Sequence, residues 1–429
     1  MRIRIKDGLY LTMDEQNLYA SGDLLIEDDR IIQVGGQAPE DWQADETISG
    51  KGKLFMPGLV NTHGHTPMSL LRGYADDLAL QVWLEDHMWP MEAKYTEQDV
   101  RYGSLLSIVE MIKGGTTTFV DMYDHTEVIA AAVEESGMRA VLTRGVIGLC
   151  SKEEQQAKLQ HAVNFAKEWH GKADGRITTM LSPHAPYTCP PDYIEQFVEA
   201  SRDLNLPIHT HMSETIKEVE QNVKDYGARP VEHLLKLGVF DRPCLLAHAV
   251  HLTDEEISIL AEYDVRVSHN PGSNLKLASG IARVPELLRA GVKVSLGTDS
   301  SASNNNLDMF EEIRLAALLH KGVTYDPTVV PALTALRMGT IAGAESIWLD
   351  EVGLLKPGCK ADIIAIDIDQ PHMIPHTDLV SHIVYSASQH DVTDVWVDGR
   401  QLLKNRALTT LDEEQIRWEA ARCFERLNG

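Results

Sequence analysis

The segment that decides the fold is residues 55–65, which read FMPGLVNTHGH. Its apolar part predicts a strand over residues 54–62, and two histidines stand where that strand would end. Successive side chains of a strand alternate between its faces, so His63 and His65 point the same way and can bind one metal ion together. Such a pair is about as often a pair of polar loop residues as a metal site. The interpretation therefore depends on ligands from later strands.

The middle of the chain alternates apolar, strand-like runs with amphipathic segments of helical character. The predicted strands are residues 54–62, 116–122, 140–146, 177–182, 207–210, 244–247, 265–268 and 293–297, and the predicted helices include 97–113, 151–169, 192–204, 254–263 and 306–320. This alternation is typical of an α/β protein, and eight strands predict a (β/α)8 TIM-type barrel. A doubly wound open sheet would give a similar pattern.

Polar residues at the strand ends favour the barrel, because loops at the C-terminal ends of barrel strands build the active site. Most of the runs end in such a residue: His63, His65, Arg144, His184, His211, His248, His269 and Asp299. A single histidine in such a place is more often a hydrogen-bonded structural residue. Recurrence at the same end of most strands predicts a site at one mouth of the barrel.

Both ends of the chain are rich in short strands and tight turns. Hairpin signals occur at Asp7-Gly8, at residues 27–30 and at Asp398-Gly399. We therefore expect residues 1–55 and 351–429 to form one small β-sandwich domain together, with a terminal helix in the second part. The barrel would then comprise residues 56–350.

Composition limits the classes of partner. The 429 residues carry 39 basic and 64 acidic side chains, a net charge of −25, which disfavours binding to nucleic acid or to an anionic membrane. The N-terminus lacks the apolar core of a signal peptide and no apolar run is long enough to span a membrane, so we expect a cytoplasmic protein. Five scattered cysteines without a Cys-x-x-Cys spacing argue against a disulfide framework and a thiolate zinc site. A homo-oligomer is compatible with these features.

Later strands supply the ligands that the histidine pair needs. His211 ends the fifth run and Asp299 the eighth, so the predicted metal ligands are His63, His65, His211 and Asp299. His209 shares a face with His211 and is interpreted as a packing or second-layer neighbour. Residues 177–182 contain no lysine to bridge a second metal, which favours one divalent ion. Zn²⁺ is the first choice, with Fe²⁺ and Mn²⁺ as alternatives.

A metal-activated water also requires groups that move protons. Glu214 is the predicted proton shuttle to a ring nitrogen of the substrate, while His248 and Asp299 would hold and deprotonate the water. Three residues beyond His211, Glu214 would face away from the site if the strand continued, so the chain must turn there.

Several motifs together resemble the aromatic-ring deaminase branch of the amidohydrolase superfamily, over nearly the whole chain. These motifs are PGLVNTHGH (57–65), His211 with Glu214, LLAH (245–248), SHNP (268–271), GTD (297–299) and GLLKPGCKAD (353–362). Within the branch the chain resembles the 5-methylthioadenosine/S-adenosylhomocysteine deaminase family in WPME (89–92), LTRG (142–145), SPHAPY (182–187) and TDSSASNN (298–305).

This resemblance implies hydrolytic deamination of the 6-amino group of adenosine-type nucleosides to the inosine analogue and ammonia. The substrates would be 5-methylthioadenosine, S-adenosylhomocysteine or adenosine. It implies that Glu92 binds the ribose hydroxyls, that His184 binds a purine nitrogen, and that Arg144 joins Glu214 and Asp299 in the substrate site. The small-molecule nucleoside would then be the only partner that the activity needs.

The sequence departs from the family pattern at one place, and two alternative functions stay open. Some family members have an additional arginine after the third strand, where residues 150–155 offer only Lys152. The nearest alternative keeps the chemistry but changes the substrate to guanine, a pterin or a halogenated triazine, none of which has a ribose for Glu92. The alternative from another class is a non-catalytic metal-binding scaffold, which would be expected to lose part of the ligand set.

Overall fold

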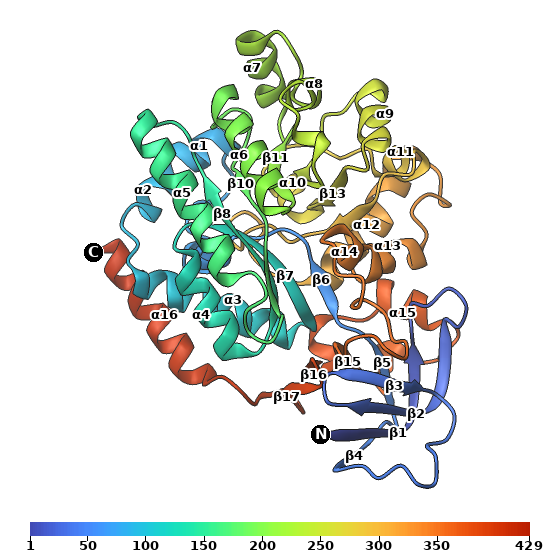
Figure 1. The fold of residues 1–429 in the computed structure, drawn as a ribbon. Coiled ribbons are helices and arrows are strands. Elements are labelled where there is room, and N and C mark those ends of the chain that lie inside the picture. Colours follow the sequence, from blue (N-terminus) through green and yellow to red (C-terminus); the bar gives the residue numbers. More distant parts are fainter.

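Parallel strands form a barrel at the centre of the molecule in the computed structural model, which describes residues 1–429 (Figure 1). Its strands are β6 (Leu59–Asn61), β7 (Thr116–Tyr123), β8 (Arg139–Val146), β9 (Ile177–Thr179) with β10 (Ser182–Pro183), β11 (Ile208–Met212), β12 (Cys244–His248), β13 (Arg266–His269) and β14 (Val294–Leu296). They form two curved sheets, ordered β10-β8-β7-β6, with β9 also on β8, and β11-β12-β13-β14.

Backbone hydrogen bonds close the two sheets into one barrel. At one seam the Leu181 N–H donates to Pro207 O over 3.0 Å, and the His209 N–H donates to Leu181 O over 2.9 Å. At the other seam the Thr62 N–H donates to Leu296 O over 2.9 Å. The prediction of a (β/α)8 TIM-type barrel is therefore confirmed, and the open-sheet alternative is wrong.

Helices surround the barrel and occupy the connections between its strands (Figure 1). They are α3 (Glu97–Lys113), α4 (Thr126–Ser136), α5 (Lys152–Trp169), α6 (Pro191–Leu204), α7 (Ile216–Tyr226), α8 (Pro230–Lys236), α9 (Asp254–Glu262), α10 (Pro271–Lys276), α11 (Val284–Arg289), α12 (Met309–Thr324), α13 (Ala332–Met338) and α14 (Ile341–Ser346), with the 3-10 turn η3 (Val239–Asp241). The predicted helix 306–320 begins only at Met309, because the Asp308 side chain accepts from the Phe310 N–H and caps the first turn.

Both chain ends build a single mixed sheet of nine strands, which confirms their predicted association. Its order is β18-β17-β16-β15-β5-β1-β2-β3, with β4 also on β1. These strands are β1 (Arg2–Leu11), β2 (Tyr19–Glu27), β3 (Arg30–Val34), β4 (Glu46–Ser49), β5 (Lys53–Pro57), β15 (Ile363–Asp367), β16 (Val392–Val397), β17 (Arg400–Lys404) and β18 (Ala407–Leu408). Helix α15 (Leu379–Tyr385) and the 3-10 turns η4 (Pro371–Met373) and η5 (Gln389–Asp391) lie between β15 and β16 in the chain.

The predicted strand 54–62 is two strands in the structure. β5 belongs to the nine-stranded sheet, where it pairs with β1 and β15, and β6 belongs to the barrel. Gly58 separates them at a close approach to Thr117, where a Cβ atom would lie 2.1 Å from the Thr117 Oγ1. The chain therefore passes from sheet to barrel at Gly58, while the division into residues 1–55, 56–350 and 351–429 stays a prediction.

Two of the three predicted hairpin turns are present. Glu27 pairs with Arg30, and Val397 pairs with Arg400. The hairpin at Asp7-Gly8 is wrong, because these residues form an irregularity inside β1, which pairs with β2 on both sides of them. Asp7 has a φ of 57°, so the Asp-Gly signal reports a local left-handed conformation and not a chain reversal.

The long connection after β6 forms a layer over the barrel mouth. It contains the 3-10 helix η1 (Thr66–Leu71), α1 (Leu80–Val82), the π-helical turn η2 (Trp83–Met88) and α2 (Trp89–Glu92). The C-terminal helix α16 (Glu413–Asn428) runs beside α3 and packs on this connection, with Met88, Met91 and Leu427 in one buried cluster (Figure 1). Among the helices of the chain, none has both the length and the apolar character needed to cross a membrane.

Candidate active site

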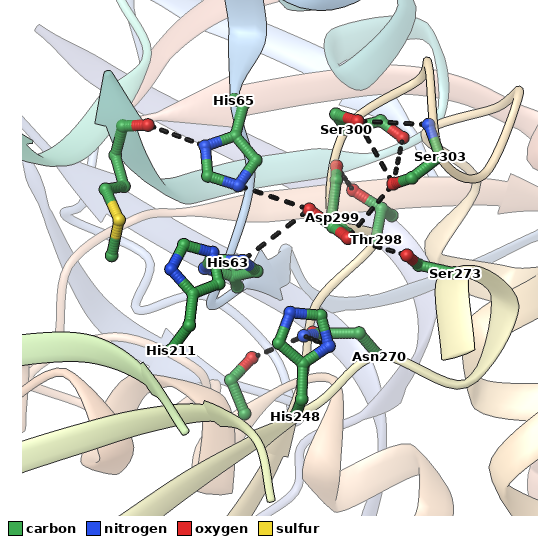
Figure 2. A network of polar contacts seen from close by, with 12 residues as sticks. His63, His65, His211, His248, Asn270, Ser273, Thr298, Asp299, Ser300 and Ser303 are labelled. Atoms are coloured by element: carbon green, nitrogen blue, oxygen red, sulfur yellow. Dashed lines mark hydrogen bonds and ion pairs between the residues drawn. The ribbon is translucent and has the colours of Figure 1, made fainter. Parts of the chain in front are cut away.

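The C-terminal ends of the barrel strands bring the four predicted metal ligands together (Figure 2). His63 and His65 follow β6, His211 lies on β11, and Asp299 follows β14. The Asp299 Oδ1 lies 3.6 Å from the His63 Nε2 and 3.3 Å from the His65 Nε2. Ligand atoms lie within 4.8 Å of one another in two overlapping groups, His63 with His65 and Asp299, and His63 with His211 and His248.

Hydrogen bonds determine which nitrogen of His63 faces this group. The His209 Nδ1–H donates to Leu245 O over 2.9 Å, so the His209 Nε2 can only accept. That nitrogen lies 3.0 Å from the His63 Nδ1, which must carry the proton between them. The His63 Nε2 is thus left as a bare lone pair, fully buried and without any hydrogen-bond partner. A buried lone pair without a partner is the state expected of a metal ligand.

The other two histidines are held in the same tautomer. The His65 Nδ1–H donates to Met122 O over 2.6 Å, and the His211 Nδ1–H donates to His184 O over 2.8 Å. The His211 Nε2 is therefore a lone pair, whereas the His65 Nε2 faces the Asp299 Oδ1 over 3.3 Å. Burial lowers the pKa of His65, but the hydrogen bond and charge of Asp299 outweigh burial and raise this pKa to about 9. Burial, together with the neighbouring histidines, lowers the pKa of His63 and His211 well below the ordinary value, which keeps both rings neutral. A divalent cation such as Zn²⁺ would take the place of the His65 proton, and three imidazoles with one carboxylate are a ligand set that fits such a cation.

Asp299 is oriented by two hydroxyl groups. Its Oδ2 accepts from the Ser273 Oγ over 2.6 Å and from the Ser303 Oγ over 3.0 Å, which leaves Oδ1 directed at the histidines (Figure 2). Burial alone would raise the pKa of Asp299, but the hydrogen bond and charge of His65 outweigh it and lower the pKa below its usual range. The carboxylate therefore stays ionised.

Glu214 enters the site because the chain turns sharply after β11. Ser213 has a φ of 52°, and the turn brings the Glu214 Oε2 to 3.7 Å from the His248 Nε2. Burial raises the pKa of Glu214 above its ordinary value, although the charge of His248 opposes this. The Asn274 Oδ1 lies 2.8 Å from the His248 Nδ1 and accepts a hydrogen bond from its N–H, which leaves the lone pair of the His248 Nε2 free to accept a proton.

A cavity of ≈ 430 Å³ opens above these residues and brings the predicted substrate contacts to one place. The predicted residues that line it are His65, Glu92, Arg144, His184, His211, Glu214, His248 and Asp299. His63 is fully buried beneath the cavity. Trp83, Trp89 and Met68 contribute apolar surface from the long connection after β6.

Each predicted substrate contact has a defined environment. The Tyr123 hydroxyl donates to Glu92, and burial raises the pKa of Glu92 despite this hydrogen bond. The Arg144 Nη2 lies 2.7 Å from the Asp124 Oδ1. Burial and the charges of nearby histidines lower the pKa of His184 to about 3, so its ring is neutral at physiological pH.

A second basic side chain, besides the predicted Arg144, lines the cavity, and it is Lys158 and not Lys152. Lys152 is 63% exposed and pairs with Asp192 on the outer surface. Lys158, one and a half turns further along α5, lines the cavity with its Nζ 3.1 Å from Ile147 O. Helical periodicity could have found it, because Lys158 is separated by one turn from the buried Gln155. Tyr123 and Ser273 were also missed, and no motif distinguishes them; Ser303 lies within the TDSSASNN motif, but its contact with Asp299 was not predicted.

Comparison with known proteins gives one consistent result. Residues 54–402 match the model of the amidohydrolase family. The chain is 51% identical over 399 residues to a 5-methylthioadenosine/S-adenosylhomocysteine deaminase of Halalkalibacterium halodurans, covering 92% of this chain and 91% of that protein.

Solved structures agree with this relationship. An adenosine deaminase from Xanthomonas campestris with bound zinc superposes with a TM-score of 0.92 at 35% identity, covering 99% of this chain and 98% of the other. A zinc complex of atrazine chlorohydrolase from Arthrobacter aurescens superposes with a TM-score of 0.91 at 26% identity, covering 98% of this chain and 100% of the other. The family match over residues 54–402, together with a relative that shares half of its residues, shows that the chain belongs to the amidohydrolase family.

Proposed function

We propose that this enzyme hydrolytically deaminates adenosine-type nucleosides at the 6-amino group and releases the inosine analogue and ammonia. 5-Methylthioadenosine, S-adenosylhomocysteine and adenosine are the substrates to be tested. The observation that carries the proposal is one cavity lined both by Glu92 and by the proton-transfer pair Glu214 and His248. The similarity to deaminases of these nucleosides supports it.

His63, His65, His211 and Asp299 would hold one divalent ion, with Zn²⁺ first and Fe²⁺ or Mn²⁺ as alternatives. The bare Nε2 of the buried His63 and the matching tautomers of His65 and His211 support this assignment. When bound, such an ion lowers the pKa of a water molecule toward neutrality and so supplies hydroxide without a strong base.

Glu214, His248 and Asp299 then account for every proton of the reaction. Burial raises the pKa of Glu214, which favours its acid form, and in that form Glu214 donates to the ring nitrogen next to the attacked carbon. The His248 Nε2 accepts the first proton of the attacking water and, at 3.7 Å, can return it to Glu214. Asp299 guides the second proton to the departing amino group. The two protons of water thus end on the ring nitrogen and on ammonia.

The substrate would be oriented by groups on three sides of the cavity. Glu92 accepts hydrogen bonds from the two ribose hydroxyls, with its carboxylate fixed by Tyr123. His184 binds a purine nitrogen through its Nε2, while its Nδ1 lies 2.9 Å from the Thr188 Oγ1. Arg144 also lines this cavity. A small nucleoside, not a polynucleotide, also suits the net charge of −25.

One assay separates this function from its rivals. Ammonia release is measured with 5-methylthioadenosine, S-adenosylhomocysteine, adenosine, guanine and a chlorotriazine, and the metal content of the same protein is determined. We expect turnover of the nucleosides with one metal ion per chain, and a large loss in Glu92→Gln. Turnover of guanine or the triazine alone would refute the nucleoside assignment, and a metal-free, inactive protein would revive the scaffold alternative.

A further inference from the structure

The first turn of α7 departs from the usual arrangement of a helix start. In a capping box the third residue of the helix accepts from the backbone N–H of the N-cap residue. Helix α5 follows this rule, since Glu154 accepts from the Ser151 N–H over 3.0 Å, and α9 begins in the same way. In α7 the N-cap is Thr215 and the third residue is Glu218, but the Thr215 N–H is not the group that Glu218 binds.

Glu218 reaches past its N-cap to the two residues before it. Its Oε1 accepts from the Ser213 N–H and its Oε2 accepts from the Glu214 N–H, each over 2.8 Å. The side chain is buried, with the residue 5% exposed. Burial raises the pKa of Glu218 to about 7, while the two backbone N–H groups oppose this and favour the carboxylate. A carboxylate held by two N–H groups fixes the peptide that carries them.

That peptide is the turn which brings Glu214 into the site. Ser213 adopts a left-handed φ of 52°, and without this turn the continuing strand would direct Glu214 away. The other side of the turn is fixed by the segment that follows β12, because the Ser213 carbonyl accepts from the N–H groups of Val250 and His251, each over 3.0 Å. The turn is therefore clamped between Glu218 and the residues that follow His248.

We propose that Glu218 is a positioning residue that holds the 213–214 turn so that the Glu214 carboxyl faces both His248 and the substrate ring. The inference rests on the proposed deaminase function and extends it to a residue that touches neither substrate nor metal. It explains why a helix-capping glutamate is buried under the active site and directed away from its own N-cap. The relevant geometry is the 3.7 Å separation of the Glu214 Oε2 and the His248 Nε2.

The test compares Glu218→Ala, Glu218→Gln and Glu154→Ala in the zinc-loaded enzyme. Displacement of a catalytic group by about 1 Å can cost about 100-fold in rate, so we expect kcat of Glu218→Ala to fall about 10- to 100-fold. KM and zinc content should stay within about twofold, since Glu92 and the metal ligands are untouched. Glu218→Gln keeps one accepting oxygen, so its kcat should lie between those of the wild type and Glu218→Ala. Glu154→Ala removes an ordinary capping glutamate and should keep wild-type kcat.

A double variant separates positioning from a general loss of stability. If Glu218 acts through Glu214, adding Glu218→Ala to Glu214→Ala should lower kcat no further. Additive losses, or a wild-type kcat in Glu218→Ala with normal zinc, would overturn the inference. A wild-type enzyme that binds zinc but releases no ammonia from any nucleoside would instead refute the proposed function, so the two failures are distinguishable.

Discussion

At the scale of single residues, the site depends on where protons sit. Glu214 must be protonated to donate to the ring nitrogen, and burial raises its pKa above the ordinary glutamate value. Its acid form is therefore kept to a higher pH than that of an exposed glutamate, and kcat should fall as pH rises through the raised pKa. Glu214→Ala should retain zinc and lose most turnover. A pH–rate profile of both proteins with metal analysis checks this, and near-normal deamination by a zinc-loaded Glu214→Ala would contradict the role.

His209 supports the second residue-scale prediction. It accepts from His63 and is itself fixed by Leu245 O, so it sets the tautomer of a proposed ligand. Loss of such an outer hydrogen bond typically lowers metal affinity about 10- to 100-fold, and we expect this for His209→Leu. Competition with a zinc chelator measures the affinity. His233→Leu, which alters a buried histidine on α8, is the control and should leave the zinc affinity unchanged. Equal zinc affinities of the two variants would contradict a role of His209 in orienting His63.

At the scale of secondary-structure elements, α5 carries a test of substrate preference. Lys158 lines the cavity, whereas Lys152 pairs with Asp192 at the surface. A cation in the pocket favours a substrate whose tail ends in a carboxylate. Lys158→Ala should therefore raise KM for S-adenosylhomocysteine several-fold without changing KM for 5-methylthioadenosine. Lys152→Ala is the matched control. If Lys158→Ala raises KM equally for both substrates, the lysine does not recognise the carboxylate tail.

Helix α16 carries the second prediction at this scale. Arg426 pairs with Asp99, which is 0% exposed at the start of α3, and the Lys94 Nζ donates to Leu427 O over 3.3 Å. The first contact holds the start of α3, and the contacts of Arg426 and Leu427 with Lys94 hold the chain two residues beyond Glu92. Arg426→Ala leaves the Asp99 carboxylate buried without its partner, so we expect a loss of about 1–3 kcal/mol in the free energy of unfolding.

The kinetic consequence should be a raised KM with little change in kcat or zinc content, because Glu92 and not the metal site is disturbed. Steady-state kinetics and thermal unfolding measure the two effects. Arg417→Ala, at an exposed position of the same helix, is the control. An unchanged KM in Arg426→Ala would mean that α16 does not influence the substrate pocket.

At the scale of the whole molecule, the sequence predicted what depends on local periodicity. The order of strands and helices follows from alternating apolar runs, and most of the polar residues at their ends lie at one mouth of the barrel. His269 does not line the cavity and is instead buried beside His320, with ring centroids 5.4 Å apart. The break at Gly58 and the irregularity at Asp7 could not be predicted from periodicity. Each depends on a contact with a residue distant in the sequence, such as Thr117 for Gly58. The tautomers of His63 and His209 likewise follow from the fold and not from spacing.

The joint between the barrel and the nine-stranded sheet gives the last prediction. Arg139, on β8 of the barrel, is 4% exposed and binds Asp362 next to β15, with the Nε 2.8 Å from Oδ2 and the Nη2 3.1 Å from Oδ1. Removing one partner leaves the other charge buried, which typically costs about 3–5 kcal/mol. Arg139→Ala should lower the free energy of unfolding by about that amount. The double variant with Asp362→Ala should lose much less than the sum of the single losses, because the two residues act as a unit. If the sheet and the barrel fold together, urea unfolding should stay a single transition in Arg139→Ala, in Asp362→Ala and in the double variant. Limited proteolysis should then release neither end of the chain as a folded piece. Two unfolding transitions in the wild type would show that the sheet and the barrel fold independently.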